Sequence, residues 1–300
     1  MESILLRCII QLPPDFRLQD VLSFHKRDQL MAAERVEGYT LHKGLVWQGH
    51  AACLTINFHP LQAEAILAID GSPADNMSTS LDQMVRRMLG LTQQIEEFEA
   101  TYRHHPEAGP LIVQHPGLRV PLSATPFEAL TWAIIGQQIS LHAAIAVRRR
   151  LIQAAGMQHS SGLYCYPDAA GIEHTSEEQL RQAGLSQSKT RTLIELSRRN
   201  LENLLPLEEW TINLPVDEMR EKLLLVPGIG PWTINYALLR GYGWLDGSLH
   251  GDVAVRRNLQ TLLDHPEKIS EKYARDWLEE FSPWRALIAA HLWAMKSLQA

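Results

Sequence analysis

The sequence predicts an α+β protein: an N-terminal antiparallel sheet with helices, residues 1–115, followed by an all-α domain, residues 116–300. Three observations support this prediction. The chain has 300 residues, the length of two domains of ordinary size. Segments with strand character are confined to the N-terminal region. From about Pro116 onward, apolar residues recur three or four positions apart, which is typical of helices.

The N-terminal region combines strand and helix patterns. An apolar β-prone run ends at Pro13, and two alternating segments follow with Gly49 and His50 between them, which predicts a hairpin turn at that pair. The segments that follow these strands have the apolar periodicity of helices. The predicted strands cover residues 3–12, 39–47 and 51–58, and the predicted helices cover residues 61–69 and 81–102.

The remaining chain predicts helices throughout. A long helix is expected over residues 126–155, with Gly156 as its C-cap because glycine takes the left-handed conformation cheaply. A capping-box pattern from Thr175 to Glu178 predicts the start of a short helix that stops at Gly184. Further helices are expected over residues 186–204, 215–225, 232–240, 252–263, 270–281 and 283–298.

The composition limits the class of protein. A formal net charge of −6 excludes a wholly basic nucleic-acid coat protein, although most of the acidic excess lies in the first 115 residues and local basic clusters remain elsewhere. Three cysteines far apart in sequence predict free thiols in a reducing, cytoplasmic compartment. No apolar run approaches the about 20 residues that a membrane helix needs, so we expect no membrane association.

The most informative segment is the sequence LLLVPGIGPWT, residues 223–233. Two glycines are expected to allow a tight turn at positive φ and the close approach of another chain, and Ile229 between them is expected to fill the core. The amides of Gly228, Gly230 and Thr233 would lie at the start of a helix, where N–H groups bind phosphate oxygens. The segment resembles the helix-hairpin-helix motif, here over residues 223–236.

About twenty residues further on, Asp252 lies in a loop, residues 248–253, just before another helix. An aspartate at a helix start is common and by itself indicates nothing. However, the spacing between the hairpin and Asp252 resembles that of the helix-hairpin-helix glycosylase superfamily of base-excision repair enzymes. In that superfamily the aspartate at this position is catalytic. A pure phosphate clamp gains nothing from a carboxylate facing the DNA backbone.

Further stretches are similar to the 3-methyladenine DNA glycosylase II (AlkA-type) family. They are PGLRVP from Pro116, AIIGQQIS from Ala133, GPWTINY from Gly230, and the segments around Trp284 and His291. The resemblance implies two helical lobes with a cleft. It implies a reaction in which a damaged base is flipped out of duplex DNA and its glycosidic bond is hydrolysed, with Asp252 stabilising the oxocarbenium-like state.

The resemblance also implies roles for individual residues. Trp232, Tyr236 and Trp293 would line an aromatic base pocket, which suits alkylated, positively charged purines. Gln138 would be the wedge that fills the vacated space, although some family members have leucine there. The carbonyls of Leu224, Val226 and Gly230 would hold a monovalent cation, Na⁺ or K⁺. No other cofactor is expected.

A missing lysine and missing C-terminal cysteines limit the reactions that this protein is expected to catalyse. Bifunctional relatives such as endonuclease III carry a lysine two residues after the second hairpin glycine, where this chain has Trp232, so water is the expected nucleophile. No cysteine follows Cys165, which excludes the C-terminal iron–sulfur cluster of some relatives. We therefore expect a monomeric, monofunctional enzyme of the bacterial cytoplasm, associated with the nucleoid and acting on double-stranded DNA containing alkylated bases. A non-catalytic DNA-binding protein and a glycosylase of another base specificity remain alternatives.

Overall fold

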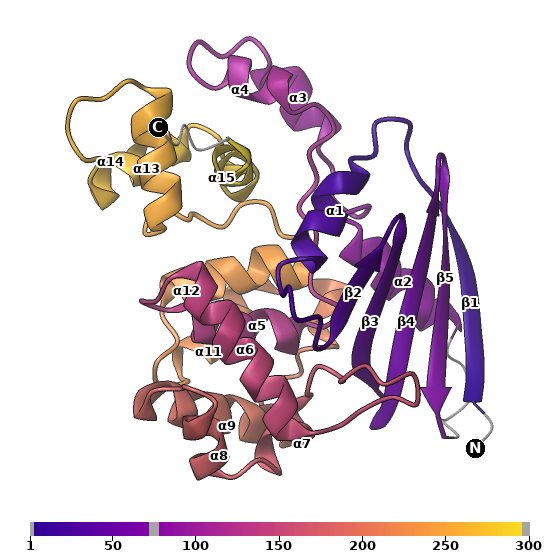
Figure 1. Cartoon of the computed structure of the whole chain (residues 1–300). Helices are drawn as coiled ribbons and strands as arrows, with labels where there is room; N and C mark the ends of the chain where they lie inside the picture. The colour runs from indigo at the N-terminus through magenta and orange to yellow at the C-terminus, as the bar shows by residue number, and fades with distance from the viewer. Residues whose placement is uncertain (1–2, 72–77, 296–300) are drawn as a thin grey trace.

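The computed structural model describes residues 3–71 and 78–295 and has an antiparallel sheet beside a larger helical part (Figure 1). The sheet has five strands in the order β1-β5-β4-β3-β2, and every neighbouring pair is antiparallel. The strands are β1 (Ser3–Gln11), β2 (Glu34–Glu37), β3 (Thr40–Trp47), β4 (His50–His59) and β5 (Gln62–Asp70). The predicted α+β class is therefore confirmed.

The predicted helix over residues 61–69 is wrong, because this segment is strand β5. Its side chains are buried alternately, Ala63, Ala65, Leu67 and Ile69 on one face, and the strand is hydrogen-bonded to β1 and β4 on its two sides. Its alanine and leucine content favours a helix in isolation, but pairing on both edges overrides so weak a preference.

Two turns also differ from the sequence prediction. The β3–β4 hairpin turns at Gln48 and Gly49, both with positive φ (47° and 79°), so His50 already belongs to β4. The helix expected over residues 81–102 is two helices, α2 (Ser78–Met88) and α3 (Glu96–Tyr102). Between them Gly90 has φ +71° and lies against Arg119, where a Cβ atom would approach the Arg119 Cβ to 2.9 Å.

The long helix expected over residues 126–155 is also interrupted. It forms α5 (Pro126–Gly136) and α6 (Leu141–Ala155), which ends at Gly156 in the predicted left-handed conformation (φ +74°). Gln138 in the short connection has φ +57°, and Ser140 caps α6 by accepting a hydrogen bond from Ala143 N. The capping serine therefore starts a second helix, and residues 138–140 of the connection are exposed.

The remaining helices include some that were predicted and some that were not. They are α1 (Leu18–His25), α4 (Gly109–Gln114), α7 (Ala169–Glu173), α8 (Glu177–Gln182), α9 (Gln187–Leu201), α10 (Trp210–Asn213), α11 (Val216–Leu224), α12 (Pro231–Ala237) with the π-helical turn η1 (Leu238–Tyr242), α13 (Val253–Leu262), α14 (Glu271–Glu279) and α15 (Arg285–Ala294). Helices α8, α9 and α11 to α15 correspond to predicted helices, whereas α1, α4, α7 and α10 were not predicted, and residues 296–298 of the last predicted helix lie outside the described ranges. The capping box of α8 joins Ser176 and Gln179, one residue later than expected, because Thr175 Oγ1 instead donates to Gly171 O.

The helices form two lobes (Figure 1). The hairpin lobe contains α5 to α12, and the C-terminal lobe contains α13 to α15 together with α3 and α4, which precede it in the chain by more than a hundred residues. Side chains of α3 and α4, including Phe98 and Leu111, belong to the same apolar core as α14 and α15. The C-terminal lobe is thus assembled from both ends of the sequence.

A buried ionic cluster joins the sheet to the hairpin lobe. Lys43 Nζ on β3 lies 2.6 Å from Glu34 Oε1 on β2 and 2.8 Å from Glu128 Oε1 on α5. Arg148 on α6 lies 2.9 Å from Glu128 Oε1 and 3.2 Å from Glu34 Oε2, and His25 Nδ1 lies 3.0 Å from Glu34 Oε1. Burial alone would raise the pKa of Glu34, but Arg148 and Lys43 hold it well below its usual value. The cluster fixes the end of α1 relative to α5.

Candidate active site

The helix-hairpin-helix turn lies between α11 and α12 at the edge of the hairpin lobe. Gly228 has φ +90°, and a Cβ there would come within 2.2 Å of Thr192 Oγ1, which donates to Pro227 O at 2.8 Å. Gly230 differs from the expectation of a second positive φ, since its φ of −117° is extended. It is the N-cap of α12 and faces open space. The first glycine therefore permits the turn, and the second leaves the helix start accessible.

Two side chains that the sequence reasoning missed tie the α5–α6 connection to this hairpin. Gln137 Nε2 donates to Gly228 O at 3.0 Å and to Thr233 Oγ1 at 2.9 Å. Lys189 Nζ on α9 donates to Ile135 O at 2.8 Å and to Gln137 O at 2.7 Å, and burial lowers its pKa. Their neighbour Gln138 is exposed beside the hairpin. The hydrogen bonds of Gln137 and Lys189 hold the backbone next to the exposed Gln138 side chain. Such support suits a residue that inserts into another molecule.

Asp252 is the N-cap of α13, at the point where the C-terminal lobe faces α12. Its Oδ1 accepts hydrogen bonds from Ala254 N at 2.9 Å and Val255 N at 3.0 Å. Trp293 Nε1 lies 3.3 Å from Oδ1, and Trp232 Nε1 lies 3.3 Å from Oδ2. Within the described ranges, no basic side chain forms an ion pair with this carboxylate. Neutral N–H groups therefore orient Asp252 without neutralising its charge.

The three aromatic residues proposed from sequence converge on this carboxylate. The ring centroids of Trp232 and Tyr236 are 5.3 Å apart on α12, and those of Tyr236 and Trp293 are 6.2 Å apart across the two lobes. Tyr236 Oη accepts a hydrogen bond from Trp132 Nε1 at 2.8 Å. Trp232 and Trp293 are half-buried, so each keeps part of its surface open beside Asp252.

The site also includes three residues that the sequence analysis did not identify. Phe24, at the end of α1, and Arg27, just after it, come from the N-terminal region, and Arg240 comes from η1. The Arg240 guanidinium lies over the rings of Phe24 (4.8 Å) and Trp293 (5.4 Å). Arg240 follows Tyr236 by four residues, a spacing that places both on one helix face. For Phe24 and Arg27, no local pattern signals the site.

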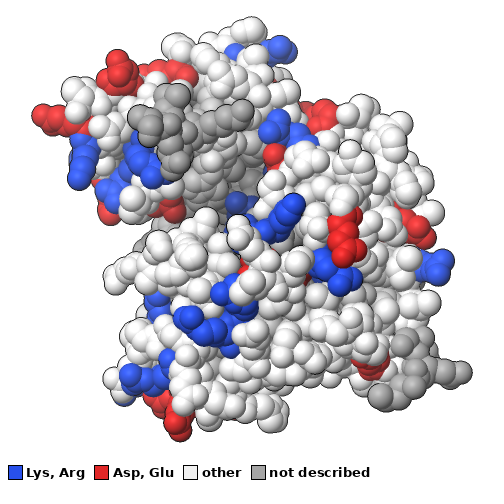
Figure 2. Space-filling view, viewed as in Figure 1, with Lys and Arg blue, Asp and Glu red and all other residues white. Residues whose placement is uncertain are grey.

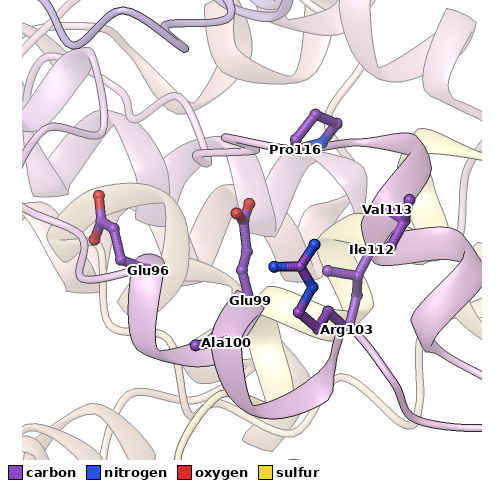
Figure 3. Close-up of a pocket in the computed structure, with 7 residues that line it drawn as sticks. All are labelled: Glu96, Glu99, Ala100, Arg103, Ile112, Val113 and Pro116. Carbon is purple, nitrogen blue, oxygen red and sulfur yellow. The ribbon is translucent and has the colours of Figure 1, made fainter.

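Figure 2 shows the surface of the molecule hollowed between the two helical lobes, with basic side chains along the hollow. Two other hollows lie away from Asp252. One, of about 280 Å³, is formed by α3 and α4, where the Glu99 and Arg103 side chains point into it (Figure 3). The other, of about 390 Å³, is lined by residues such as Tyr242 and Trp244. Neither contains a residue of the aromatic cluster.

The expected cation ligands are backbone carbonyls on either side of the hairpin turn. Val226 O accepts a hydrogen bond from Ile229 N, and Gly230 O accepts one from Ile234 N, so each oxygen keeps a second lone pair. Leu224 lies at the end of α11. Carbonyl oxygens suit Na⁺ or K⁺, so this donor set is chemically compatible with such an ion. Elsewhere in the described ranges, no three His, Cys, Asp or Glu side chains are grouped as metal ligands would be.

Comparison with known proteins identifies the family to which this chain belongs. The profile described as "HhH-GPD superfamily base excision DNA repair protein" matches residues 131–283, and that of the "AlkA N-terminal domain" matches residues 9–125. The chain belongs to the HhH-GPD superfamily. DNA-3-methyladenine glycosylase 2 of Escherichia coli is 30% identical over 193 residues, which cover 64% of this chain and 65% of that protein. The match thus spans just under two thirds of this relative's length.

Two solved structures share the fold over almost the whole chain. The 3-methyladenine DNA glycosylase from Archaeoglobus fulgidus has a TM-score of 0.78 at 24% identity, covering 95% of this chain and 96% of that one. The 8-oxoguanine glycosylase/lyase of Clostridium acetobutylicum, bound to double-stranded DNA, has a TM-score of 0.71 at 15% identity, covering 97% and 95%. Among the helices described here, none is both long and apolar enough to cross a bilayer.

Proposed function

We propose that this HhH-GPD protein is a monofunctional DNA glycosylase that releases alkylated purines such as 3-methyladenine from double-stranded DNA. The observation that carries the proposal is the Asp252 carboxylate, held at 3.3 Å by two tryptophan N–H groups beside an aromatic cluster. The relative from Escherichia coli, named a DNA-3-methyladenine glycosylase, supports the substrate class.

The hairpin and the exposed loop would bind the DNA. The amides of Gly228, Gly230 and Thr233 would bind a phosphate at the start of α12, and a monovalent cation on the carbonyls of Leu224, Val226 and Gly230 would add positive charge there. Gln138 would enter the space that the damaged base leaves. Its rigid neighbours, Gln137 and Lys189, suit that role because a wedge must not move while bases unstack.

In the reaction, the flipped base would lie against Trp232, Tyr236 and Trp293. A purine methylated at a ring nitrogen is cationic, so it leaves as a neutral base when the C1′–N bond breaks. Positive charge then develops on the sugar, where the Asp252 carboxylate stabilises it, since no cation among the described residues is paired with that carboxylate. Water adds to C1′ and releases its proton to the solvent. Trp232 stands in the lysine position and the Lys189 amine donates to two carbonyls, so neither residue offers an amine to the sugar.

The test replaces the carboxylate with its amide. Asp252→Asn should lower release of 3-methyladenine from a methylated duplex at least about 100-fold, because charge stabilisation is lost while the N-cap is kept. Binding to the same duplex should survive. Asp168→Asn is the matched control, since Asp168 caps α7 in the same way, by accepting from Gly171 N at 2.8 Å.

Three results separate this proposal from its alternatives. Full activity of Asp252→Asn would refute the role of the carboxylate. DNA binding by the wild-type protein without release of any base would indicate a non-catalytic binding protein. Strand nicks without alkali, scored separately from free base, would contradict the monofunctional assignment.

A further inference from the structure

The side-chain contacts that orient the Asp252 carboxylate across the cleft are long. Trp232 Nε1 and Trp293 Nε1 each lie 3.3 Å from a carboxylate oxygen, beyond the about 2.7–3.2 Å that is usual for an N–H donor. The two tryptophans come from different lobes, Trp232 from α12 and Trp293 from α15. Two such contacts are too weak to fix a carboxylate between two lobes. The backbone that carries these three side chains is therefore held by other bonds.

One of these bonds is made by Asn235 on α12, which holds the loop that leads to Asp252. Its Nδ2 donates to Ser248 O at 2.9 Å. Asn235 is buried, and a Cβ atom at Gly247 would approach the Asn235 Cβ to 3.1 Å, so the loop backbone lies directly on this residue. Because Asn235 and Trp232 share α12, the bond fixes the loop relative to the helix that supplies one of the two tryptophans.

Asn258 makes the corresponding bond in the C-terminal lobe. It lies on α13, the helix that Asp252 caps, and its Nδ2 donates to Leu292 O at 2.8 Å. Leu292 precedes Trp293 in the last turn of α15, where backbone carbonyls lack the usual helical partner. Asn258 is buried as well. It thus fixes the end of α15, and with it Trp293, relative to the helix of the carboxylate.

Both asparagines are paired at each end of the amide. A buried amide destabilises a fold unless its hydrogen bonds to water are replaced. Here each Oδ1 also lies 3.4 Å from an arginine nitrogen, Arg220 Nη2 for Asn235 and Arg257 Nε for Asn258. A paired amide specifies a single relative position of two backbone segments, which apolar contacts alone do not. Both amides therefore suit the task of holding the segments around the carboxylate in one arrangement.

We propose that Asn235 and Asn258 are positioning residues for the glycosylase reaction, and that each holds one tryptophan N–H where it orients the Asp252 carboxylate. Asn235 acts through Trp232, and Asn258 acts through Trp293. Both asparagines are buried, so they act through these partners and not on the substrate. The inference rests on the proposed glycosylase function, to which it adds two residues that the family resemblance did not supply.

The first experiment separates the chemical step from DNA binding. Asn235→Leu and Asn258→Leu keep the size of the side chain and remove the donor. With protein in saturating excess over a methylated duplex, the single-turnover rate constant for release of 3-methyladenine should fall about 10-fold or more, because a small displacement of a catalytic group suffices for such a loss. The Kd for a duplex with an abasic-site analogue should change less than about threefold.

Asn200→Leu is the matched control for both substitutions. Asn200 lies near the end of α9, and its Nδ2 donates to Leu205 O at 2.8 Å, so the same kind of bond is removed. That bond joins no segment that carries Asp252 or either tryptophan. The substitution should therefore change neither the rate constant nor the Kd.

The second experiment tests the route through each tryptophan. Trp232→Phe and Trp293→Phe each keep an aromatic ring and remove one N–H. Asn258→Leu should lower the rate constant less than about twofold in the Trp293→Phe background and about 10-fold or more in the Trp232→Phe background. Asn235→Leu should give the reverse pattern. An asparagine that only stabilises its lobe would lower the rate constant equally in both backgrounds.

The saturating protein concentration makes the rate constant independent of the folded fraction, so a destabilised variant still gives an answer. Asn235→Ser and Asn258→Ser, whose side chains are too short to reach the two carbonyls, replace a leucine variant that does not fold. Unchanged rate constants, a loss confined to the Kd, or equal losses in both tryptophan backgrounds would each overturn the positioning role. Release of 3-methyladenine by the wild-type protein would then still support the glycosylase, whereas its failure to release any base would refute the proposed function itself.

Discussion

Two groups of charged side chains in this molecule are arranged in opposite ways. Where the sheet meets the hairpin lobe, Lys43 and Arg148 are paired with Glu34 and Glu128 at 2.6–3.2 Å. Every one of these charges has an opposite charge as partner. They act on nothing outside the protein, because all four are buried.

At the aromatic cluster the charges are kept apart. Among the described residues, Asp252 accepts hydrogen bonds from neutral N–H groups only, and Arg27 and Arg240 lie on aromatic rings. In the proposed reaction, an arginine paired with Asp252 would neutralise the charge that stabilises the transition state. The same residue types therefore hold the fold together where they are paired, and under the proposed function they act on a substrate where they are unpaired.

The largest effect on stability is expected from breaking the paired cluster. Lys43→Met leaves Glu34 and Glu128 buried with Arg148 as their remaining strong cationic partner, so the free energy of unfolding should fall by about 3–5 kcal/mol. Urea denaturation measures this change. Lys272→Met removes an exposed pair with Asp276 and should cost less than about 1 kcal/mol. Equal effects of the two substitutions would show that the cluster does not stabilise the junction.

Features that depend on local sequence were predicted, whereas features that depend on long-range contacts were missed. The hairpin turn was predicted because glycine geometry depends on a few adjacent residues, and Asp252 was singled out by the family resemblance that its spacing from the hairpin carries. Strand β5 was missed because its two hydrogen-bonded neighbours, β1 and β4, override its local preference. Phe24 and Arg27 were missed because α1 reaches the cluster only through the tertiary fold, across the sheet–lobe junction.

The break between α5 and α6 shows that prediction from local sequence can fail within a single segment. Periodicity runs through residues 126–155 without interruption, yet Ser140 starts a new helix and Gln138 takes a left-handed conformation. The bonds that stabilise this shape come from Lys189 and from the hairpin, far along the chain. The shape of the α5–α6 connection is thus determined by contacts that no local sequence pattern records.

A smaller effect on the free energy of unfolding is expected from a buried histidine that has neither an ion-pair partner nor a hydrogen-bond partner among the described residues. His291 on α15 is fully buried, and neither of its ring nitrogens has a hydrogen-bond partner among the described residues. Burial, with the nearby charges of His115 and Arg17, lowers its pKa to about 3. Below about pH 6.5 the unfolded chain therefore binds a proton that the folded protein does not bind, and stability should fall by about 1.4 kcal/mol per pH unit as the pH drops toward 3.

The substitution His291→Met should remove that acid sensitivity. Urea denaturation of both proteins between pH 7.5 and about 4.5 isolates this residue, because all other titrating groups are common to the two. The difference in the free energy of unfolding should be constant above about pH 6.5 and change steadily in favour of the variant below it. A constant difference over the whole range would mean that His291 can be protonated in the folded state.

The smallest change in stability is expected where the change in activity is largest. Asp252→Asn keeps an N-cap of equal quality, and asparagine Oδ1 can still accept from Ala254 N and Val255 N. No ion pair is lost, so the free energy of unfolding should change by less than about 1 kcal/mol, measured by the same urea denaturation as for Lys43→Met. A loss of about 3 kcal/mol or more would place Asp252 with the paired cluster, as a residue that maintains the fold. A near-constant stability together with the loss of base release would show that this carboxylate is kept unpaired for the substrate, because the protein itself gains almost nothing from its charge.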